Sequence, residues 1–276
     1  MNREPHIKIL VLNWNGENII CECLSSLKKI DYINYSIDVI DNGSSDNSVN
    51  VIEKNFSNIN IHKIKNNLGY SRGYNLIFKK LNTNNFDYYL LLNNDVYVDK
   101  NILKVLVYKM NELGADNIYG SKINYSDDLT RIWYAGGYFN KYLGFAKHVG
   151  INKYEKNIKY KTTQTGYVSG CSMLIKKDLI NILNGFNDSF KMYYEDVDLC
   201  YRASFLGKKS FFIEDAIIYH KVSYSIGNNT LKKVITKLVS QIKFIYFHNN
   251  IILFIISLFL NLILLPFSFI LYFIRK

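Results

Sequence analysis

The sequence is poor in cysteine, and its cysteines are not arranged as a metal site. It has four, Cys21, Cys23, Cys171 and Cys200, in 276 residues. Cys21 and Cys23 are two positions apart in a helical pattern, so their side chains point in different directions. No second cysteine pair or histidine pair has the spacing of a zinc finger. We therefore expect reduced thiols in a cytosolic protein, where they serve mostly in packing.

The sequence also has no secretory signal, and its last sixth has no acids. An ordinary strand pattern begins at Ile7, within a few residues of the start. The net charge is +11, and more than half of this excess lies between Leu231 and Lys276, where six basic residues occur without an acid. A basic segment beside an apolar run suits an anionic membrane surface. Nucleic acid is a weaker candidate, because no compact basic and aromatic binding motif is present.

There is no internal repeat, and the first third of the chain alternates between short apolar runs and helical patterns. The predicted strands are Ile7–Leu12, Ser36–Ile40, Ile59–Ile64 and Tyr88–Leu92. The predicted helices between them are Glu17–Ile30, Val49–Phe56 and a segment that ends at Leu81. This alternation predicts an α/β domain with a mostly parallel sheet and right-handed crossovers.

Three polar loops follow three of these strands. They are Asn13–Gly16, Asp41–Asp46 and Asn93–Asp95. Ligands bind at the carboxyl ends of the strands in such sheets. The three loops are therefore expected to converge on one binding rim.

Beyond Leu113 the pattern is less regular and predicts short elements. We expect short antiparallel strands between Gly120 and Gly150. Further expected elements are a strand within Thr165–Ile175, helices at Lys177–Leu183 and Glu195–Phe205, and two short strands at Ser210–Ile213 and Ala216–Tyr219.

Acidic residues interrupt two apolar stretches. Glu195, Asp196 and Asp198 lie in the aromatic segment 192–202, and Asp95 closes the apolar run 88–95. Acids in such surroundings are costly unless they have a partner or a function. An acid at a strand end, together with an acid at a helix start, suggests metal-assisted group transfer.

The end of the chain predicts association with a membrane. Apolar residues recur at helical spacing from Leu231 to His248, with lysines between them, as in an interfacial helix. Ile251–Ile274 is uncharged, and at about 1.5 Å per residue it is long enough to span a bilayer. Asn261 and Pro266 weaken the spanning interpretation, so a re-entrant or in-plane hairpin stays open. We thus expect a catalytic domain at 1–228, an amphipathic helix at 229–249 and a hydrophobic anchor at 250–276.

The ordered set of motifs resembles the family 2 inverting glycosyltransferases of the GT-A fold. The resemblance is greatest to the rhamnosyltransferase-like members of bacterial polysaccharide assembly. The matching segments keep the family's order over roughly 7–225, and they are Leu12–Gly16, Asp41–Asp46, Asn66–Asn75, Leu92–Asp95, Ser169–Gly170, Gly185–Phe186, Tyr194–Leu199 with Arg202, and His220. The resemblance implies a Rossmann-like, mostly parallel sheet with helices on both faces.

The resemblance also implies a nucleotide-diphosphate sugar donor (a UDP-, dTDP- or GDP-sugar) and a divalent cation, Mn²⁺ or Mg²⁺. Asp41 is implied to contact the base. The residues implied to bind the donor are Asn13, Asn15, Asp41, Arg72, Asn94 and Asp95. Asp95 and His220 would ligate the metal, Asp196 would be the general base, and Glu195 would be its acidic neighbour. The chain departs from the family's Asp-x-Asp motif, because Asn93 and Asn94 precede Asp95, and fewer carboxylates imply weaker metal binding.

These residue types suit the chemistry of sugar transfer. A departing nucleotide diphosphate builds negative charge that a divalent cation neutralises. A carboxylate within reach of the acceptor hydroxyl takes its proton. In-line attack inverts the anomeric carbon without a covalent sugar–enzyme intermediate.

Each residue also has a structural interpretation. Asp41 is equally suited to cap the helix that follows it. Glu195 and Asp196 suit a helix N-terminus through the helix dipole, and Asp198 suits an ion pair with Arg202 at i,i+4, so we leave it out of catalysis. Other structural roles are a surface arginine at Arg72 and a structural histidine at His220.

Three functions compete at this stage. We favour a glycosyltransferase that acts at the cytoplasmic face of the inner membrane on a lipid-linked glycan. The alternative is a non-catalytic nucleotide-sugar or glycan-binding protein that retains the fold. A nucleotidyltransferase is disfavoured, because no Gly-rich, Arg/Lys-bearing phosphate loop occurs near the N-terminus.

Overall fold

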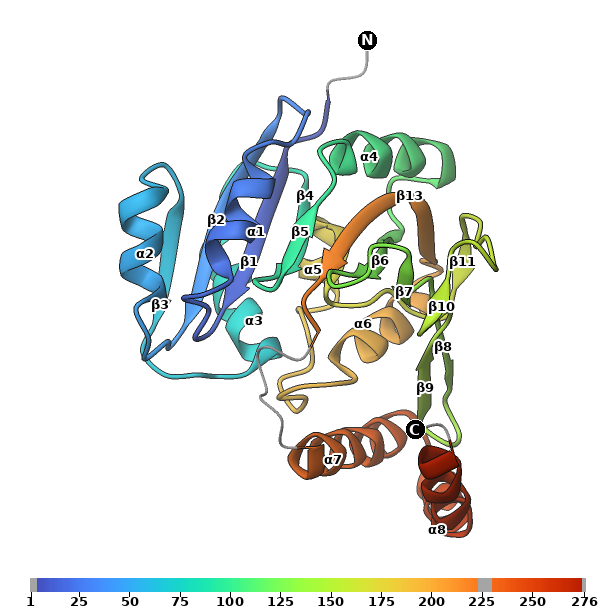
Figure 1. Ribbon diagram of the computed structural model, residues 1–276. Helices are drawn as coiled ribbons and strands as arrows, with labels where there is room; N and C mark the ends of the chain where they lie inside the picture. Colours follow the sequence, from blue (N-terminus) through green and yellow to red (C-terminus); the bar gives the residue numbers. More distant parts are fainter. Residues whose placement is uncertain (1–3, 223–229, 275–276) are drawn as a thin grey trace.

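The computed structural model describes residues 4–222 and 230–274, without the side chains of residues 230, 232 and 264–274. A large sheet, with the strand order β10-β7-β6-β12-β4-β1-β2-β3, runs through the centre of the molecule. Helices lie on both of its sides, with α1 in front of β1 and β2 and α5 behind the sheet in the view of Figure 1. The predicted α/β fold is confirmed.

The first half of the sheet is parallel. β1 pairs in parallel with β2 and β4, and β2 pairs in parallel with β3. Most residues of β1 and β4 are buried, as expected for strands covered on both faces. The strands are β1 (Ile7–Asn13), β2 (Tyr35–Asn42), β3 (Asn60–Ile64) and β4 (Tyr88–Asn93), and the connecting helices are α1 (Ile20–Leu27), α2 (Ser48–Asn55) and α3 (Tyr70–Leu81).

The second half of the sheet is mixed. β12 (Ser172–Lys176) runs antiparallel between β4 and β6 (Ile118–Tyr125). β13 (Ser210–His220) is parallel to β6 and antiparallel to β5 (Val96–Val98). The remaining elements are α4 (Ile102–Leu113), β7 (Arg131–Tyr134), β8 (Gly137–Asn140), β9 (Phe145–His148), β10 (Lys153–Tyr154), β11 (Thr163–Thr165), α5 (Lys177–Ile182) and α6 (Glu195–Ser204).

One prediction about the strands was wrong in detail. The two short strands predicted between Ser210 and Tyr219 form one strand, β13, whose pairing with β6 shifts register between Ile213 and Ile217. The polar pair Glu214–Asp215 marks this irregularity, and in the sequence it looks like the end of a strand. The strand predicted within Thr165–Ile175 is confirmed as β12, which begins at Ser172, whereas Thr165 at the start of that range ends β11.

Two helices follow the sheet. α7 (Thr230–His248) and α8 (Ile251–Ile274) lie below it in Figure 1, beside the free end of the β8–β9 hairpin. Gln241 Nε2 and Asn261 Nδ2 both donate to the carbonyl oxygen of Leu143 in that hairpin, at 2.9 and 3.1 Å. Within the described part of the chain, no helix combines the length and the apolar character needed to cross a membrane. The predicted anchor at 250–276 lies partly outside it, because side chains from 264 onward are not described.

Candidate active site

The polar ends of the parallel strands meet, as the sequence predicts. Asn13 at the end of β1 lies opposite Asp41 in the parallel register. Asn13 Nδ2 donates to Asp41 Oδ1 at 3.1 Å, and Asn94 Nδ2 donates to Asn13 Oδ1 at 2.8 Å. All three side chains are nearly fully buried. A Cβ on Gly16 would lie 2.3 Å from Asn13 Oδ1 and 2.4 Å from Asn94 Nδ2, so the rim requires glycine there.

Asn15 and Arg72 lie outside this network. Asn15 adopts a left-handed conformation at φ 51°, and its side-chain oxygen accepts a hydrogen bond from the Ser45 amide at 2.8 Å. This hydrogen bond connects the loop 13–16 with the loop 41–46. Arg72 is exposed on the first turn of α3, which begins after Gly69.

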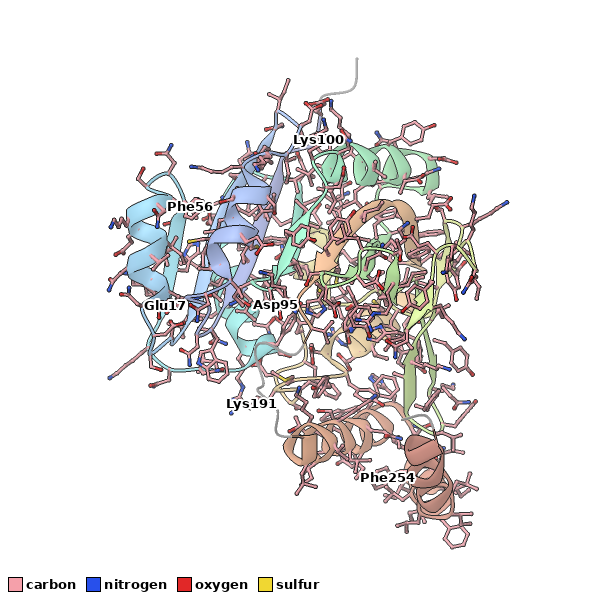
Figure 2. All side chains as sticks on the ribbon, viewed as in Figure 1. Glu17, Phe56, Asp95, Lys100, Lys191 and Phe254 are labelled. Carbon is pink, nitrogen blue, oxygen red and sulfur yellow. The ribbon has the colours of Figure 1, made fainter. Side chains whose placement is uncertain are left out.

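Asp95 is paired with the distant residue His220. The Nε2 atom of His220, the last residue of β13, lies 3.2 Å from Asp95 Oδ1, and both side chains are largely buried. Burial alone would lower the pKa of His220, but its neighbours Cys171 and Asp95 raise it. The Trp133 ring covers the histidine at 4.7 Å between ring centroids. Asp95 lies near the middle of the molecule, where the two halves of the sheet meet (Figure 2).

The acid pair begins α6 after a strained turn. Tyr193 and Tyr194 have φ of 66° and 69°, a conformation that side chains other than glycine rarely adopt. Such strain persists only where the surroundings fix it, and it is common at functional sites. The turn places Glu195 and Asp196 at the start of α6.

The two acids have different environments. Burial, and then the charge of Asp196, raise the pKa of Glu195 well above its usual range, and Glu195 Oε2 has no hydrogen-bond partner among the described residues. Burial also raises the pKa of Asp196, although its carboxylate accepts hydrogen bonds from the amides of Gly170 and Val197 at 3.0 and 2.8 Å. Burial raises the pKa of both acids, and that of Glu195 further, so Glu195 keeps its proton more readily than Asp196 does.

One short segment connects the acid pair with Asp95. The Gly170 amide donates to Asp196, and the neighbouring carbonyl of Cys171 accepts from the Asn93 amide at 3.4 Å, at the end of β4. After burial and His220, the charges of Asp95 and Asp196 both act on the pKa of the Cys171 thiol. The structure thus brings Asp95, His220, Glu195 and Asp196 to one region.

The interpretation of Asp198 as an ion-pair partner is confirmed. Arg202 Nε lies 2.7 Å from Asp198 Oδ2, and the Asp198 side chain is fully buried. The other carboxylate oxygen, Oδ1, accepts a hydrogen bond from His248 Nε2 at 2.8 Å. No local pattern indicates this contact, because His248 lies on α7, 50 positions away in the sequence.

Sequence reasoning also missed Tyr70 and Cys171. Tyr70 lies in a segment that the resemblance singled out, and its hydroxyl donates to the Gly170 carbonyl at 2.7 Å. All four cysteines are free, and three are buried, as predicted for packing residues. Cys171 differs from the other three cysteines, because its thiol lies beside His220 in the candidate site.

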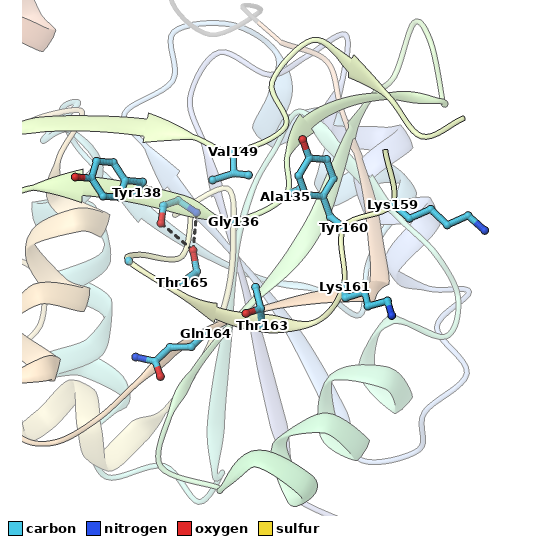
Figure 3. A pocket seen from close by; sticks show the side chains of 12 residues that line it. Ala135, Gly136, Tyr138, Val149, Lys159, Tyr160, Lys161, Thr163, Gln164 and Thr165 are labelled. Atoms are coloured by element: carbon cyan, nitrogen blue, oxygen red, sulfur yellow. Dashed lines mark hydrogen bonds between the residues drawn. The ribbon is translucent and has the colours of Figure 1, made fainter. Parts of the chain in front are cut away.

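A separate cavity of about 550 Å³ lies away from these residues. Figure 3 shows it between β8 and β11, where the Thr165 hydroxyl bonds to the backbone of Gly137. Tyr138, Tyr160 and Lys161 are among its lining residues, and none of the predicted site residues is.

The residues at Asp95 fit a divalent cation that a substrate helps to hold. No cluster of three His, Cys, Asp or Glu side chains suitable for a metal occurs within residues 4–222 and 230–263. Asp95 and His220 therefore offer one carboxylate and one imidazole. Mg²⁺ is commonly bound by one or two carboxylates together with substrate phosphates, and imidazole suits Mn²⁺ less than oxygen ligands do.

Comparison with known proteins identifies the family of the chain. The family described as Glycosyl transferase family 2 matches residues 8–183. The chain is 24% identical to the glycosyltransferase GlyG of Streptococcus pneumoniae over 225 residues, which are 80% of this chain and 72% of GlyG. It is 32% identical to the rhamnosyltransferase WbbL of Escherichia coli over 84 residues, which are 29% of this chain and 30% of WbbL.

Solved structures show the same fold. The structure of GalNAc-T7 with UDP, GalNAc and Mn²⁺ has a TM-score of 0.65 at 14% identity, over 80% of this chain and 44% of that chain. The mannosyltransferase PcManGT of Pyrobaculum calidifontis, in complex with GDP-Man and Mn²⁺, has a TM-score of 0.64 at 13% identity, over 90% of this chain and 66% of that chain. The chain thus spans less than half of GalNAc-T7. It belongs to glycosyl transferase family 2 and is a glycosyltransferase with the GT-A fold.

Proposed function

We propose that the protein transfers a sugar from a nucleotide-diphosphate donor to a glycan acceptor, with inversion at the anomeric carbon. The observation that carries the proposal is the segment 170–171, which hydrogen-bonds to Asp196 on one side and to the end of β4, two residues before Asp95, on the other. A phosphate-binding region and a carboxylate base would then lie on either side of the same sugar. The family relatives named as glycosyltransferases support this reaction class.

The donor would bind at the rim formed by the parallel strands. Asp41 and Asn13 would hold the base, as already arranged by their mutual hydrogen bond. The exposed Arg72 would add positive charge beside the nucleotide, and Asn94 would keep Asn13 oriented. UDP-, dTDP- and GDP-sugars are all candidate donors.

Asp95 and His220 would hold Mn²⁺ or Mg²⁺ together with the donor diphosphate. The bound cation would supply Lewis-acid neutralisation of the leaving group. To bind it, His220 must be neutral and must leave its direct contact with Asp95. Structural neighbours determined with Mn²⁺ and a nucleotide or nucleotide sugar support this assignment.

Asp196 would take the proton of the acceptor hydroxyl. Its raised pKa makes it a stronger base than an exposed aspartate, and general-base catalysis typically contributes about 10²–10⁴-fold. Glu195 would remain protonated beside it, since burial raises its pKa further. The buried pair of Glu195 and Asp196 would then carry one negative charge instead of two.

The acceptor is proposed to be lipid-linked, with the enzyme at the cytoplasmic face of the membrane. The outer face of α7 supports this, because Leu231, Ile235 and Leu238 are 69%, 52% and 38% exposed. α8 continues the apolar surface with Ile252 and Phe259, which are 66% and 65% exposed. Apolar side chains beside lysines favour an interface with anionic lipids.

Flotation with vesicles of phosphatidylglycerol tests the membrane proposal. We expect wild-type protein to float with these vesicles at low salt, and Ile252→Glu combined with Ile235→Glu to reduce the bound fraction. Equal flotation of both proteins would contradict it. Leu129→Glu serves as the control, because Leu129 is also an exposed apolar residue but lies outside α7 and α8. This variant should float as the wild type does.

A donor screen tests the reaction itself. The protein is incubated with each common UDP-, dTDP- and GDP-sugar, with Mn²⁺ or Mg²⁺, and thermal stabilisation and slow donor hydrolysis are followed. We expect one donor to give both signals, and Asp95→Ala to abolish the metal dependence. Stabilisation by a donor without any turnover, in the presence of glycan acceptors, would favour a non-catalytic binding protein.

A further inference from the structure

The Asp196 carboxylate is held from outside its own helix by Gly170. The Gly170 amide donates to Asp196 Oδ2 at 3.0 Å, whereas the other donor, the Val197 amide, belongs to the same helix as the acid. Glycine has wide backbone freedom, so the direction of its amide depends on what fixes the residue in place. The position of the candidate base therefore depends on the contacts that other parts of the chain make with Gly170.

Tyr70, the first residue of α3, makes such a contact. Its hydroxyl donates to the Gly170 carbonyl at 2.7 Å. A Cβ on Gly170 would lie 2.6 Å from the hydroxyl oxygen of Tyr70, so the missing side chain lets the tyrosine approach this closely. Gly170 thus connects the two residues, because its carbonyl meets Tyr70 and its amide meets Asp196.

The turn that leads into the acid pair is attached to the same end of α3. The Tyr70 amide donates to the carbonyl of Lys191 at 3.0 Å, and Lys191 precedes the strained turn at Tyr193 (Figure 2). A Cβ on Gly69 would lie 2.6 Å from that carbonyl oxygen, so the two backbones can meet only because Gly69 has no side chain. Tyr70 therefore contacts the chain before the acid pair through its backbone, and reaches Asp196 through its hydroxyl.

Asn75, further along α3, holds an earlier part of the acid-bearing segment. Its Nδ2 donates to the Phe186 carbonyl at 2.7 Å, and its Oδ1 accepts from the Phe186 amide at 2.9 Å. Nδ2 also donates to Asp188 Oδ1 at 2.7 Å. Two bonds to the backbone of one residue fix both the position and the direction of the chain there, as they do between paired strands.

The start of α3 is itself held by the strand that carries Asp41. Asn42, the last residue of β2, donates from Nδ2 to the Gly69 carbonyl at 3.0 Å, and its Oδ1 accepts from the Leu68 amide at 3.0 Å. The Asn42 side chain is nearly fully buried. The start of α3 therefore has a fixed position relative to the rim that carries Asp41.

We propose that Tyr70 and Asn75 are positioning residues for the sugar transfer, and that they align Asp196 with a donor bound at the rim. Tyr70 would set the carboxylate through Gly170, and Asn75 would set the segment 185–188 that leads to it. One helix would then hold the base and the nucleotide-binding rim in register. This inference rests on the proposed transferase function, in which Asp196 is the base.

A small displacement of the base is enough to lower the rate. A misplacement of about 1 Å can cost about 10²-fold. Loss of the Tyr70 hydroxyl leaves Gly170 in the chain but frees its orientation, so we expect a smaller displacement and a loss of about tenfold. The nucleotide would bind at Asn13 and Asp41, which Tyr70 does not hydrogen-bond, so the affinity for UDP should change less than about twofold.

A double-mutant cycle with Tyr70→Phe and Asp196→Asn tests the inference. The assay follows release of radiolabelled sugar from UDP-, dTDP- and GDP-sugars with Mn²⁺ and with water as the acceptor. Water attacks the anomeric carbon, the bond to the diphosphate oxygen breaks, and the proton passes to Asp196. We expect Tyr70→Phe to lower the rate about tenfold in the wild-type background and less than about twofold in Asp196→Asn, because residues that act as a unit are not additive. Asn75→Ala should show the same pattern.

Tyr88→Phe is the matched control. The Tyr88 hydroxyl donates to the Ala115 carbonyl at 3.0 Å, so this variant also removes a hydroxyl from a backbone carbonyl. Tyr88 begins β4, at the opposite end of that strand from Asn93 and the candidate site. The control should lower Tm about as much as Tyr70→Phe does, and should leave the rate and the affinity for UDP unchanged.

The remaining results would each overturn a defined part of the account. An unchanged rate in Tyr70→Phe, or the same fold loss in both backgrounds, would overturn the inference, since Tyr70 would then act independently of Asp196. A loss of UDP affinity as large as the loss of rate would also overturn it, because Tyr70 would then belong to the donor site. A wild-type rate in Asp196→Asn would instead reject the assignment of the base. Absence of turnover by the wild-type protein with every donor would reject the transferase function, and the inference with it.

Discussion

Replacing His248 with alanine should destabilise the protein and detach α7 from the acid-bearing helix. The His248 Nε2 atom donates to Asp198 Oδ1 at 2.8 Å, and the Asp198 side chain has no solvent exposure. The alanine variant leaves that oxygen buried without this donor. The stability of the folded protein should fall for two reasons, which can be estimated separately.

The first contribution is the unsatisfied carboxylate oxygen, which costs about 1–3 kcal/mol. Arg202 still holds the other oxygen at 2.7 Å, so the loss stays below the roughly 3–5 kcal/mol of a fully unpaired buried charge. The second contribution is the ring packing of His248 on Tyr201 and Phe244, each at 4.7 Å, worth about 0.5–1.5 kcal/mol. Together they give about 2–4 kcal/mol.

Thermal unfolding followed by circular dichroism measures this change. For a domain of this size, about 1 kcal/mol shifts Tm by roughly 2–4 °C, so we expect a decrease of about 4–16 °C. His248→Gln keeps a donor near the position of Nε2 and should recover part of the loss. Tyr246→Ala changes an exposed aromatic residue on the same helix, 58% accessible, and should have a small effect. Equal Tm values for His248→Ala and Tyr246→Ala would refute the reasoning.

Three further predictions concern the site and its surroundings. Gly16→Ala should weaken nucleotide binding about tenfold, because its Cβ would lie 2.3 Å from Asn13 Oδ1 and would displace that side chain from the rim. Titration with UDP or GDP checks this loss of affinity. The folded-state pKa of His148, about 3, is below its unfolded value, so the unfolded chain binds the extra proton and stability falls as pH drops below about 6.5. His148→Asn should remove about 1–2 kcal/mol of the acid-induced loss at pH 5, seen in urea unfolding at pH 5 and 7. Tyr70→Phe removes the hydroxyl that donates to the Gly170 carbonyl at 2.7 Å, and should cost about 1 kcal/mol of stability and lower turnover more than donor affinity.

The parallel half of the fold could be predicted because local signals determine it. The runs that form β1 and β4 are apolar throughout, as buried parallel strands require, and the polar loops that follow them meet at one rim. Asn13, Asp41 and Asn94 were therefore found from sequence, and the structure joins them by hydrogen bonds. Their roles in binding a nucleotide remain predictions.

The other half depends on contacts between distant positions. His220 meets Asp95 through the pairing of β13 with β5. Only the family resemblance put these two residues at one site, because no local pattern near either residue indicates that pairing. β13 was divided in two, because a local polar interruption resembles a strand end while the pairing with β6 continues past it. The contacts of α7 with Asp198 and Met192 depend on how a surface helix docks, which periodicity does not reveal.

The central claim is that Asp196 is the base of a sugar transfer, and the most direct test compares Asp196→Asn with the wild type. The measurement is the rate of sugar transfer at saturating donor and metal, alongside the affinity for the donor. The account predicts a loss of at least about 10²-fold in rate with donor affinity unchanged, because the amide cannot accept the proton of the acceptor hydroxyl. A variant that transfers sugar at the wild-type rate would contradict it.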